Sequence, residues 1–370
     1  MKIALIGNSD VSIYTYRYEL VKKLLDDGHS VSVISPNGKL IADLIEMGCD
    51  FYETQLDRHG TNPVNDLKLL NFYKKILKKI QPDFVFTYTI KPNIYGAMAC
   101  KKLKIPCIAN ITGLGTAVEN DGVLQKITTM LYKIAFKKNQ TIFFQNAENM
   151  QFFVDRKLYV EKHKLLPGSG VNLSRFIPYE YPSDETIEFV FISRLMKEKG
   201  IDQYLEAAEF IKNKYPHTRF HICGFCEKEY EEKMRDLEEN DTVIYHGMVK
   251  DIATILKNVH CTVHPTYYPE GLSNVLLESC ACARPIITTD RAGCREVVED
   301  GVNGFVVKQK DSEDLILQIE KFLALTNEER RQMGLNGRQK VEREFDRNIV
   351  VNAYLKEIGA EEEALVEVYL

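Results

Sequence analysis

Two glutamates stand on either side of a predicted helix start in the stretch YPEGLSNVLLE, residues 268–278. The stretch follows the apolar run CTVHP, which predicts a strand, so we expect a helix beginning near Ser273 to point its first turn toward a ligand. The unpaired N–H groups and the dipole of such a helix end favour an anion. Glu270 precedes this end, and Glu278 lies roughly 7.5 Å beyond Ser273 at about 1.5 Å per residue.

Carboxylates accept hydrogen bonds from sugar hydroxyls. A ligand that places its diphosphate at the helix end and carries one hydroxyl-bearing group on each side of that diphosphate would therefore be a nucleotide sugar. The alternative is that Glu278 marks an exposed edge of the helix, because unpaired acids are seldom buried.

Two cations near another strand end could neutralise that diphosphate. The stretch ISRLMKEKG supplies Arg194 and Lys199, five residues apart, at the end of a predicted strand. Arginine offers a fork of donors to phosphate oxygens, and lysine offers a point charge. The chain contains no Asp-x-Asp, the short motif that holds Mg²⁺ on a diphosphate, so we expect no metal and no other cofactor. A solvated surface run is the alternative explanation for KEK.

Together these residues resemble the signature of glycosyltransferase family four: two glutamates separated by seven residues, and the stretch SRLMKEKG. GSGVNLSRF (residues 168–176) and AGCREVVEDGVNGFVV (residues 292–307) resemble two further blocks of the family, with Asn172 where Asp is commoner. The resemblance covers nearly the whole chain. It implies a GT-B fold, catalysis without a metal, and retention of the anomeric configuration.

The resemblance also implies roles for residues of the second half. Glu270 would contact the transferred sugar, Glu278 the ribose, and the cations the diphosphate. The backbone would complete this cradle at Gly271, Leu272, Ser273 and Asn274. No side chain is an obvious covalent nucleophile, so catalysis would rest on electrostatic stabilisation of the departing diphosphate, with Arg194, Lys199 and Glu270 as the catalytic residues.

The elements that must position these residues alternate between apolar strands and amphipathic helices. Strands are expected at residues 2–7, 30–35, 84–88, 107–112 and 141–146, and again at 189–194, 219–224, 243–247, 261–265 and 285–289. Apolar runs joined by helices indicate parallel sheets covered on both faces. We therefore expect an α/β protein with two Rossmann-like doubly wound domains, facing each other across a cleft as in GT-B enzymes.

The stretch IPYEYPSDETIE, residues 177–188, reads as the linker between these domains because it combines prolines with acids. We place an N-terminal acceptor-binding domain at residues 1–178 and a nucleotide-sugar-binding domain at 179–345. A C-terminal helical segment at 346–370 can cross back to the first domain.

The first half is expected to bind the acceptor. GNSDVSIYTYR follows the first strand but lacks the G-x-G-x-x-G of a dinucleotide site, which argues against a dehydrogenase. SIYTYR, TIKPNIYG and TGLGTA resemble the branch that extends lipid-linked bacterial oligosaccharides, often from UDP-N-acetylhexosamines. The loop ITGLGTAVEN contains no histidine, so the catalytic histidine of many family members cannot be carried over. Acceptor-side candidates, each with a structural role as an equal alternative, are Asn8, Ser12, Tyr14, Arg17, His59, Lys91 and Thr112.

Composition excludes several other classes of protein. A chain of 370 residues with 45% hydrophobic and 27% charged residues is typical of a globular protein with roughly two domains. No apolar run approaches the ~18 residues of a membrane span, and MKIALIGNSD does not read as a signal peptide, so we expect a cytoplasmic protein. A zinc site would need a second pair of cysteines at ligand spacing besides Cys223 and Cys226, and the sequence has none. Cys223 and Cys226 could form a redox pair, but a strand end followed by a loop explains them better.

Charge is unevenly distributed along the chain. Residues 1–175 carry 24 Lys and Arg against 16 Asp and Glu, whereas residues 176–370 carry 24 against 37. A basic half can face anionic lipid or phosphate, although two domains of different pI would give the same split. The stretch VLQKITTMLYKIAFKK, residues 123–138, interleaves apolar side chains with Lys126, Lys133, Lys137 and Lys138. Such a helix can lie in a membrane interface or simply cover the sheet.

We therefore predict a retaining hexosyltransferase. It would move a hexose or N-acetylhexosamine from a UDP nucleotide sugar to a saccharide acceptor, lipid-linked, in bacterial surface-glycan or glycoprotein-glycan assembly. Its partners would be these substrates and the inner face of an anionic membrane, and no nucleic acid is expected. Two alternatives stay open: a nucleotide-sugar epimerase of the same architecture, which needs no acceptor, and a non-catalytic nucleotide-sugar-binding protein, which turns nothing over.

Overall fold

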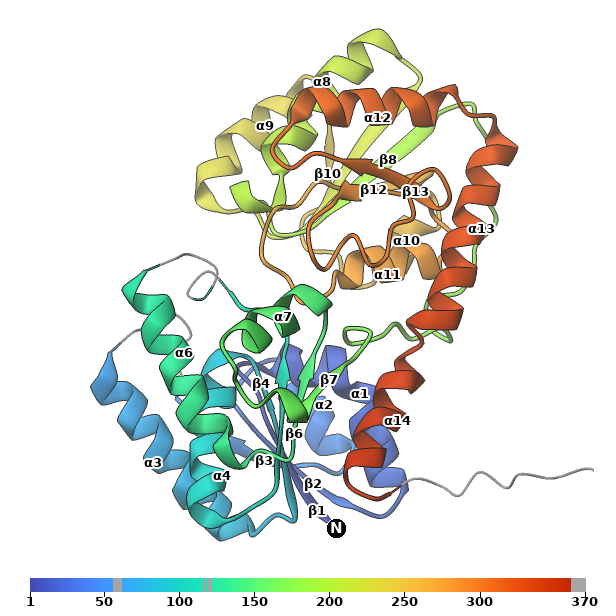
Figure 1. Ribbon diagram of the computed structural model, residues 1–370. Helices are drawn as coiled ribbons and strands as arrows, with labels where there is room; N and C mark the ends of the chain where they lie inside the picture. The colour runs from blue at the N-terminus through green and yellow to red at the C-terminus, as the bar shows by residue number, and fades with distance from the viewer. Residues whose placement is uncertain (56–61, 116–117, 119–121, 361–370) are drawn as a thin grey trace, which may run out of the picture. The chain divides into compact units, whose positions relative to one another are not determined.

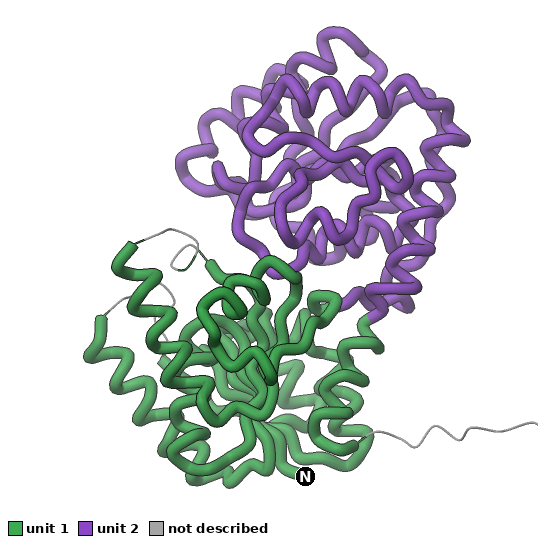
Figure 2. The backbone as a smooth tube through the Cα atoms, viewed as in Figure 1, with its two compact units in different colours: residues 1–169, 347–370 green, residues 170–346 purple. Residues whose placement is uncertain are grey.

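Two parallel sheets organise the chain, one in each of two units (Figure 2). Unit 1 comprises Met1–Ser169 with Arg347–Leu370, and unit 2 comprises Gly170–Asp346. The computed structural model describes residues 1–55, 62–115, 118 and 122–360.

The boundary between the units lies at residues 169/170 instead of 178/179. Residues 177–186, which the sequence suggests as a linker, pack within unit 2. The buried guanidinium of Arg284 donates to the carbonyls of Tyr179 (3.3 Å) and Glu180 (2.8 Å), and the Tyr181 hydroxyl donates to the carbonyl of His260 (3.0 Å). Prolines and acids gave this segment the composition of a linker, but a buried cation from a distant part of the chain fixes its backbone.

The sheet of unit 1 has the strand order β3-β2-β1-β4-β5-β6-β7, and every neighbouring pair is parallel. Its strands are β1 (Lys2–Ile6), β2 (Ser30–Ser35), β3 (Asp50–Glu53), β4 (Phe84–Tyr88), β5 (Cys107–Ile111), β6 (Thr141–Phe144) and β7 (His163–Leu165).

Helices cover both faces of this sheet (Figure 1). One face carries α1 (Asp10–Asp26), α2 (Ile41–Glu46) and α14 (Arg347–Glu357). The other carries α3 (Pro63–Ile80), η1 (a π-helical turn, Pro92–Gly96), α4 (Ala97–Leu103), α6 (Val123–Ala135) and α7 (Ala147–Asp155), with the short turn η2 (Phe136–Lys138) after α6.

The last described helix, α14, belongs to unit 1 although unit 2 precedes it in the chain. Its Tyr354 ring packs against the rings of Phe86 (4.9 Å) and Phe143 (5.0 Å), and its hydroxyl accepts a hydrogen bond from Asn110 (2.9 Å). A fully buried tyrosine with a satisfied hydroxyl anchors the helix on the sheet.

The sheet of unit 2 has the order β10-β9-β8-β11-β12-β13 and is also parallel throughout. Its strands are β8 (Ile187–Ile192), β9 (Thr218–Cys223), β10 (Ile244–Tyr245), β11 (Cys261–His264), β12 (Ile286–Thr289) and β13 (Gly304–Val307). One face carries α8 (Ile201–Lys214), α9 (Glu231–Glu239) and α12 (Ser312–Ala324), and the other α10 (Ala253–Leu256), α11 (Asn274–Ala281) and α13 (Asn327–Glu344) (Figure 1).

The predicted fold class is confirmed: both sheets are parallel and covered on both faces, and every strand expected from the sequence is present. Three short strands were not expected. β3 (DFYE) and β7 (HKL) lack apolar runs, and β13 (GFVV) lies inside a stretch that was interpreted only as a family motif. No helix in the described part of the chain is both long and apolar enough to cross a bilayer.

Candidate functional site

The strand order of unit 2 reverses between β8 and β11, which are neighbours in the sheet. Ligands of doubly wound sheets bind outside the carboxyl ends of the strands at such a reversal. Here the loop after β8 carries Arg194 and Lys199, and the loop after β11 carries Glu270. The fold thus brings both predicted clusters to the same edge of one sheet.

Backbone contacts fasten these two loops to each other. The Tyr267 N–H donates to the carbonyl of Glu198 (2.9 Å), and the Thr266 hydroxyl approaches the same oxygen at 3.3 Å. Gly200 has φ +79°, and a Cβ added there would meet the Pro265 carbonyl oxygen at 2.2 Å. Only glycine permits this close approach of the two backbones, and the approach brings Lys199 close to the loop after β11.

Lys199 and Glu270 form an ion pair in which each side chain is only 15% exposed. The Lys199 ammonium also lies 4.7 Å from the centre of the Tyr268 ring, close enough for a cation–π contact. Burial alone raises the pKa of Glu270, but the charge of Lys199 and the neighbouring imidazole of His264 outweigh burial and lower that pKa to about 2. The carboxylate is therefore fully ionised at neutral pH.

His264, the last residue of β11, is a member of this site that sequence reasoning missed. Its side chain is buried, and its Nε2 lies 3.8 Å from Glu270 Oε1, which is long for a hydrogen bond. Neither ring nitrogen has a hydrogen-bond partner among the described residues. The available signal was its position: a histidine at the carboxyl end of a buried parallel strand lies where such sheets bind ligands.

The first turn of α11 offers part of the predicted cradle. Ser273 is the N-cap of this helix, and its buried hydroxyl has no hydrogen-bond partner within the described part of the chain. Its N–H is already engaged with the carbonyl of Gly293 (2.8 Å). In this conformation the Ser273 amide is therefore not available to a phosphate, whereas its hydroxyl is unsatisfied. Of the other predicted positions, Gly271 and Leu272 are buried and Asn274 is half-buried.

Gly293 brings the loop after β12 against the same place. It has φ +92°, and a Cβ added there would lie 3.0 Å from the Gly271 carbonyl oxygen and 3.4 Å from Glu270 Cβ. The motif at residues 292–307 thus contributes a close backbone approach to the site.

The other two predicted donor-site residues have different surroundings. Arg194 is half-exposed, and its guanidinium lies 3.6 Å from the carboxylate of Glu227. Glu278 is half-buried on α11, four residues before Cys282, whose pKa burial raises to about 12, with a smaller upward contribution from Glu278. Of the four predicted charged residues, Lys199 and Glu270 are paired with each other.

In unit 1, three acceptor-side candidates follow neighbouring strands. Asn8 comes after β1, Lys91 after β4 and Thr112 after β5, so all three belong to the carboxyl edge of the sheet, and each is half-buried. Lys91 also lines a cavity of about 840 Å³. His59 lies outside the described residues.

The candidates on α1 make structural contacts. Ser12 donates its hydroxyl to the carbonyl of Ser9 (2.6 Å), and the half-buried Tyr14 packs edge-on against Tyr18. Arg17 is 3% exposed, and its guanidinium lies 4.6 Å from the centre of the Tyr88 ring. The guanidinium also donates to the Tyr16 carbonyl and the Ser169 hydroxyl, a pattern typical of a packing residue.

Within the described residues, no group of three or more His, Cys, Asp or Glu side chains could hold a metal ion. All nine cysteines are free thiols. Burial raises the pKa of Cys223 to about 12 and also raises the pKa of Cys226, which opposes thiolate formation at this pair.

Two family models match the chain. Residues 177–340 match "Glycosyl transferases group 1", and residues 2–146 match "Glycosyl transferase 4-like". The first match spans every strand of the unit 2 sheet, the second spans β1 to β6 of unit 1, and together they confirm the resemblance that the motifs indicated.

Two curated bacterial proteins are similar to the chain. The N,N'-diacetylbacillosaminyl-diphospho-undecaprenol alpha-1,3-N-acetylgalactosaminyltransferase of Campylobacter jejuni is 28% identical, over 96% of this chain and 98% of the relative. The UDP-Gal:alpha-D-GlcNAc-diphosphoundecaprenol alpha-1,3-galactosyltransferase of Escherichia coli is 26% identical, over 68% of this chain and 69% of the relative.

Solved structures share the fold. Anabaena Alr3699/HepE, determined in complex with UDP and glucose, superposes with a TM-score of 0.80 at 17% identity, covering 98% of this chain and all of that one. A glycosyltransferase from Rickettsia africae superposes with a TM-score of 0.79 at 20% identity, covering 96% and 97%. The GT-B architecture is therefore confirmed.

Proposed function

We propose that this chain, whose residues 177–340 match the group 1 glycosyl transferases and whose residues 2–146 match the glycosyl transferase 4-like model, moves a hexose or N-acetylhexosamine from a UDP-sugar to a saccharide carried on a lipid diphosphate. The observation that carries this proposal is the buried Lys199–Glu270 pair beside the start of α11, at the strand-order reversal of unit 2. These groups suit a sugar diphosphate, because a cation and a helix start bind the phosphates and a carboxylate accepts hydrogen bonds from the sugar.

The donor would be held by these groups as follows. Lys199, joined by Arg194, would bind the diphosphate, and Glu270 would accept hydrogen bonds from the sugar. Glu278 would take the ribose. The unsatisfied Ser273 hydroxyl and the amides near Gly271, Leu272 and Asn274 would complete the phosphate cradle. Because Glu270 holds Lys199 in the ligand-free protein, the diphosphate must compete for that cation, and His264 is placed to face the carboxylate once Lys199 turns away.

The reaction would join an acceptor hydroxyl oxygen to the anomeric carbon of the sugar. The bond from that carbon to the diphosphate breaks, UDP leaves with its electron pair, and the hydroxyl proton passes to the leaving phosphate or to solvent. We propose that configuration is retained and that no metal takes part, because Lys199 and the helix end supply positive charge where the diphosphate departs. The alpha linkage named for both relatives supports retention, since UDP-galactose carries its sugar in alpha linkage.

The acceptor proposal rests on the relatives. Both are named for acceptors in which a sugar is joined through diphosphate to undecaprenol, and one is named for a UDP-linked donor. The Campylobacter relative spans nearly the full length of both chains, which favours a similar acceptor class here.

Helix α6 supports contact with a membrane. Its inward side chains include Thr128 and Tyr132, whereas its outward stripe recurs at intervals of three and four residues. We call the outward residues the α6 surface: Val123, Ile127, Met130 and Ile134, with the exposed Lys126, Lys133, Lys137 and Lys138. The four apolar side chains are between 41% and 74% exposed, more apolar surface than a helix serving only to cover a sheet needs. We propose that this surface rests on the anionic inner face of the membrane.

A thermal-shift panel of UDP-, GDP-, ADP- and dTDP-sugars tests the donor assignment, because a bound ligand raises apparent stability by mass action. We expect a shift with UDP-sugars only, and transfer to a diphosphoundecaprenol-linked saccharide. UDP-sugar turnover without any acceptor would favour the epimerase alternative. Binding with neither transfer nor turnover would favour a non-catalytic protein, and no shift with any UDP-sugar would contradict the proposal.

A further inference from the structure

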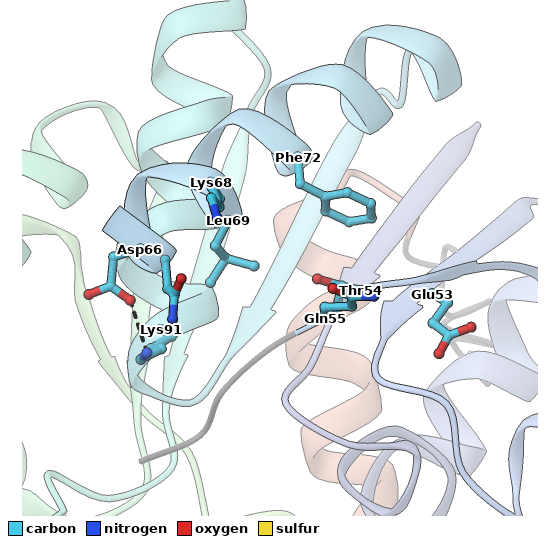
Figure 3. A pocket seen from close by; sticks show the side chains of 9 residues that line it. Glu53, Thr54, Gln55, Asp66, Lys68, Leu69, Phe72 and Lys91 are labelled. Atoms are coloured by element: carbon cyan, nitrogen blue, oxygen red, sulfur yellow. Dashed lines mark hydrogen bonds and ion pairs between the residues drawn. The ribbon is translucent and has the colours of Figure 1, made fainter. Parts of the chain in front are cut away.

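We propose that the cavity of about 840 Å³ in unit 1 binds the saccharide part of the acceptor and that this saccharide is uncharged. That the bound saccharide is the acceptor rests on the proposed function. That the cavity binds a saccharide does not. The cavity is lined by the last residue of β3 and the two residues after it, by the first turns of α3 and by Lys91 ahead of η1 (Figure 3). Its volume falls in the range of roughly 300–1,000 Å³ that is usual for small-ligand sites.

A fixed carboxylate stands in this cavity. Lys91 donates to one oxygen of Asp66 (2.9 Å), and the Tyr95 hydroxyl donates to the other (2.9 Å). The Asp66 and Lys91 side chains are 17% and 16% exposed. A carboxylate has about four acceptor positions, and these two donors from the described part of the chain use two of them, which leaves positions for hydroxyl or amide donors of a ligand.

The local backbone explains why both carboxylate oxygens of Asp66 accept a hydrogen bond. η1 is a π-helical turn, and such turns often lie at functional sites. It places Lys91, its N-cap, and Tyr95, its fourth residue, toward one residue of α3. Holding the carboxylate rigid before the ligand arrives lowers the entropy lost on binding.

The charges that line the cavity balance. Among the described residues that line it, Glu53 and Asp66 supply two negative charges, and Lys68 and Lys91 supply two positive ones. One cation is already paired with Asp66, so a diphosphate would meet a carboxylate at each side of the cavity instead of a surplus of cations. A neutral molecule rich in hydroxyl groups fits this balance better.

Two further groups favour a sugar. Thr54 is 2% exposed, and its hydroxyl has no hydrogen-bond partner among the residues that the structure describes. An unsatisfied buried hydroxyl that lines a cavity is expected to meet a polar group of whatever fills it. In Figure 3 the half-buried Phe72 ring points toward Thr54, with the Asp66–Lys91 pair to one side and Glu53 to the other. The C–H face of a sugar can pack on such a ring while its hydroxyls reach the acids.

The chain contains no tryptophan, so Phe72→Trp makes emission report on this cavity alone. We would titrate this variant with N-acetyllactosamine and N,N'-diacetylchitobiose as neutral probes and with inorganic pyrophosphate as a charged probe. The control is Phe210→Trp, on the exposed side of α8 in unit 2. We expect a saturable change of emission with a neutral saccharide in the cavity variant, none with pyrophosphate, and none with either in the control.

Adding Asp66→Asn to Phe72→Trp should raise the Kd for the saccharide about tenfold or more, because a charged hydrogen-bond acceptor is lost. If circular dichroism shows that Asp66→Asn does not fold, the exposed Asn65→Ala should still raise the Kd about threefold. The proposal is overturned if neither saccharide changes the emission, if only pyrophosphate does, or if the foldable lining variant leaves the Kd unchanged. UDP binding is measured in parallel: saccharide binding without UDP binding would contradict the donor assignment alone, and UDP binding without saccharide binding would contradict this cavity alone.

Discussion

Replacing Lys199 by methionine should lower the free energy of unfolding of unit 2 by about 3 kcal/mol at pH 7. The substitution keeps most of the side-chain volume and removes the charge that compensates Glu270, whose side chain is 15% exposed. The pKa of Glu270 lies at about 2, against 4.5 for an unperturbed carboxyl. At about 1.36 kcal/mol per pH unit this difference corresponds to about 3 kcal/mol, and breaking a buried ion pair on one side typically costs about 3–5 kcal/mol.

The effect should depend on pH in a fixed direction. The pKa of Glu270 is lower in the folded protein than in the unfolded chain, so its ionised form stabilises the fold. This contribution is fully present above about pH 4.5, the unfolded value, and is lost as the pH falls toward 2. The difference between wild type and Lys199→Met should therefore be constant from about pH 6 to 8 and shrink below about pH 4.5.

Hydrogen exchange of peptides from β8 and β11 measures the opening of unit 2 without assuming that the whole chain unfolds in one step. A double-mutant cycle compares Lys199→Met, Glu270→Gln and the double variant. We expect a coupling of about 3 kcal/mol, so the double variant should be about as stable as either single one. Lys197→Met, an exposed lysine of the same turn, is the control and should change stability by less than about 0.5 kcal/mol. Additive effects of the two single changes would refute the buried-pair reasoning.

Four further outcomes are expected. Glu278→Gln should weaken UDP and UDP-sugar equally, by about tenfold or more, in calorimetric titrations; normal UDP binding would contradict the ribose role. Gly200→Ala should cost at least about 2 kcal/mol more than Gly28→Ala in denaturant melts, since both have positive φ but only the former clashes with the Pro265 carbonyl. Changing the four lysines of the α6 surface to glutamate should abolish flotation with phosphatidylglycerol vesicles and leave UDP-sugar binding intact; wild-type protein that stays off such vesicles at low salt would contradict membrane contact. Sugar transfer should persist in excess EDTA, and activity lost with EDTA and restored by Mg²⁺ would contradict the metal-free reaction.

Much of the fold was predictable because strand and helix periodicities are local. Apolar runs such as FVFTY and SVSVIS became β4 and β2 over the expected residues. The strands that were missed are those whose existence depends on neighbours: β3 has a half-exposed, mixed sequence, and its pairing with β2 makes it a strand. The unit boundary was misplaced for the same reason, since Arg284 comes from more than a hundred residues later than the backbone that it fixes.

The candidate site divides in a similar way. Residue type and spacing predicted Lys199 and Glu270 as members of one site, but not that they pair with each other in the ligand-free protein. His264 was hidden inside an apolar run, where periodicity suggests only packing. The cavity of unit 1 could not be predicted, because Asp66 and Lys91 belong to separate elements and nothing local in either sequence indicates the other.

The proposed membrane surface and the proposed saccharide cavity both belong to unit 1, and their charges differ in a way that suits a lipid-linked acceptor. The turn η1 packs against α6 and also against α3, whose first turns line the cavity. In the cavity, the Lys91 cation is paired with Asp66. A lipid diphosphate carries its negative charge next to the membrane and its neutral sugars beyond it. Lysines on the α6 surface and a cavity whose described lining charges balance match that order, because anionic headgroups and diphosphate attract lysines while hydroxyls need fixed acceptors. This arrangement predicts that the lysine changes weaken only lipid-borne acceptors, whereas changes at Asp66 weaken free and lipid-borne saccharides alike.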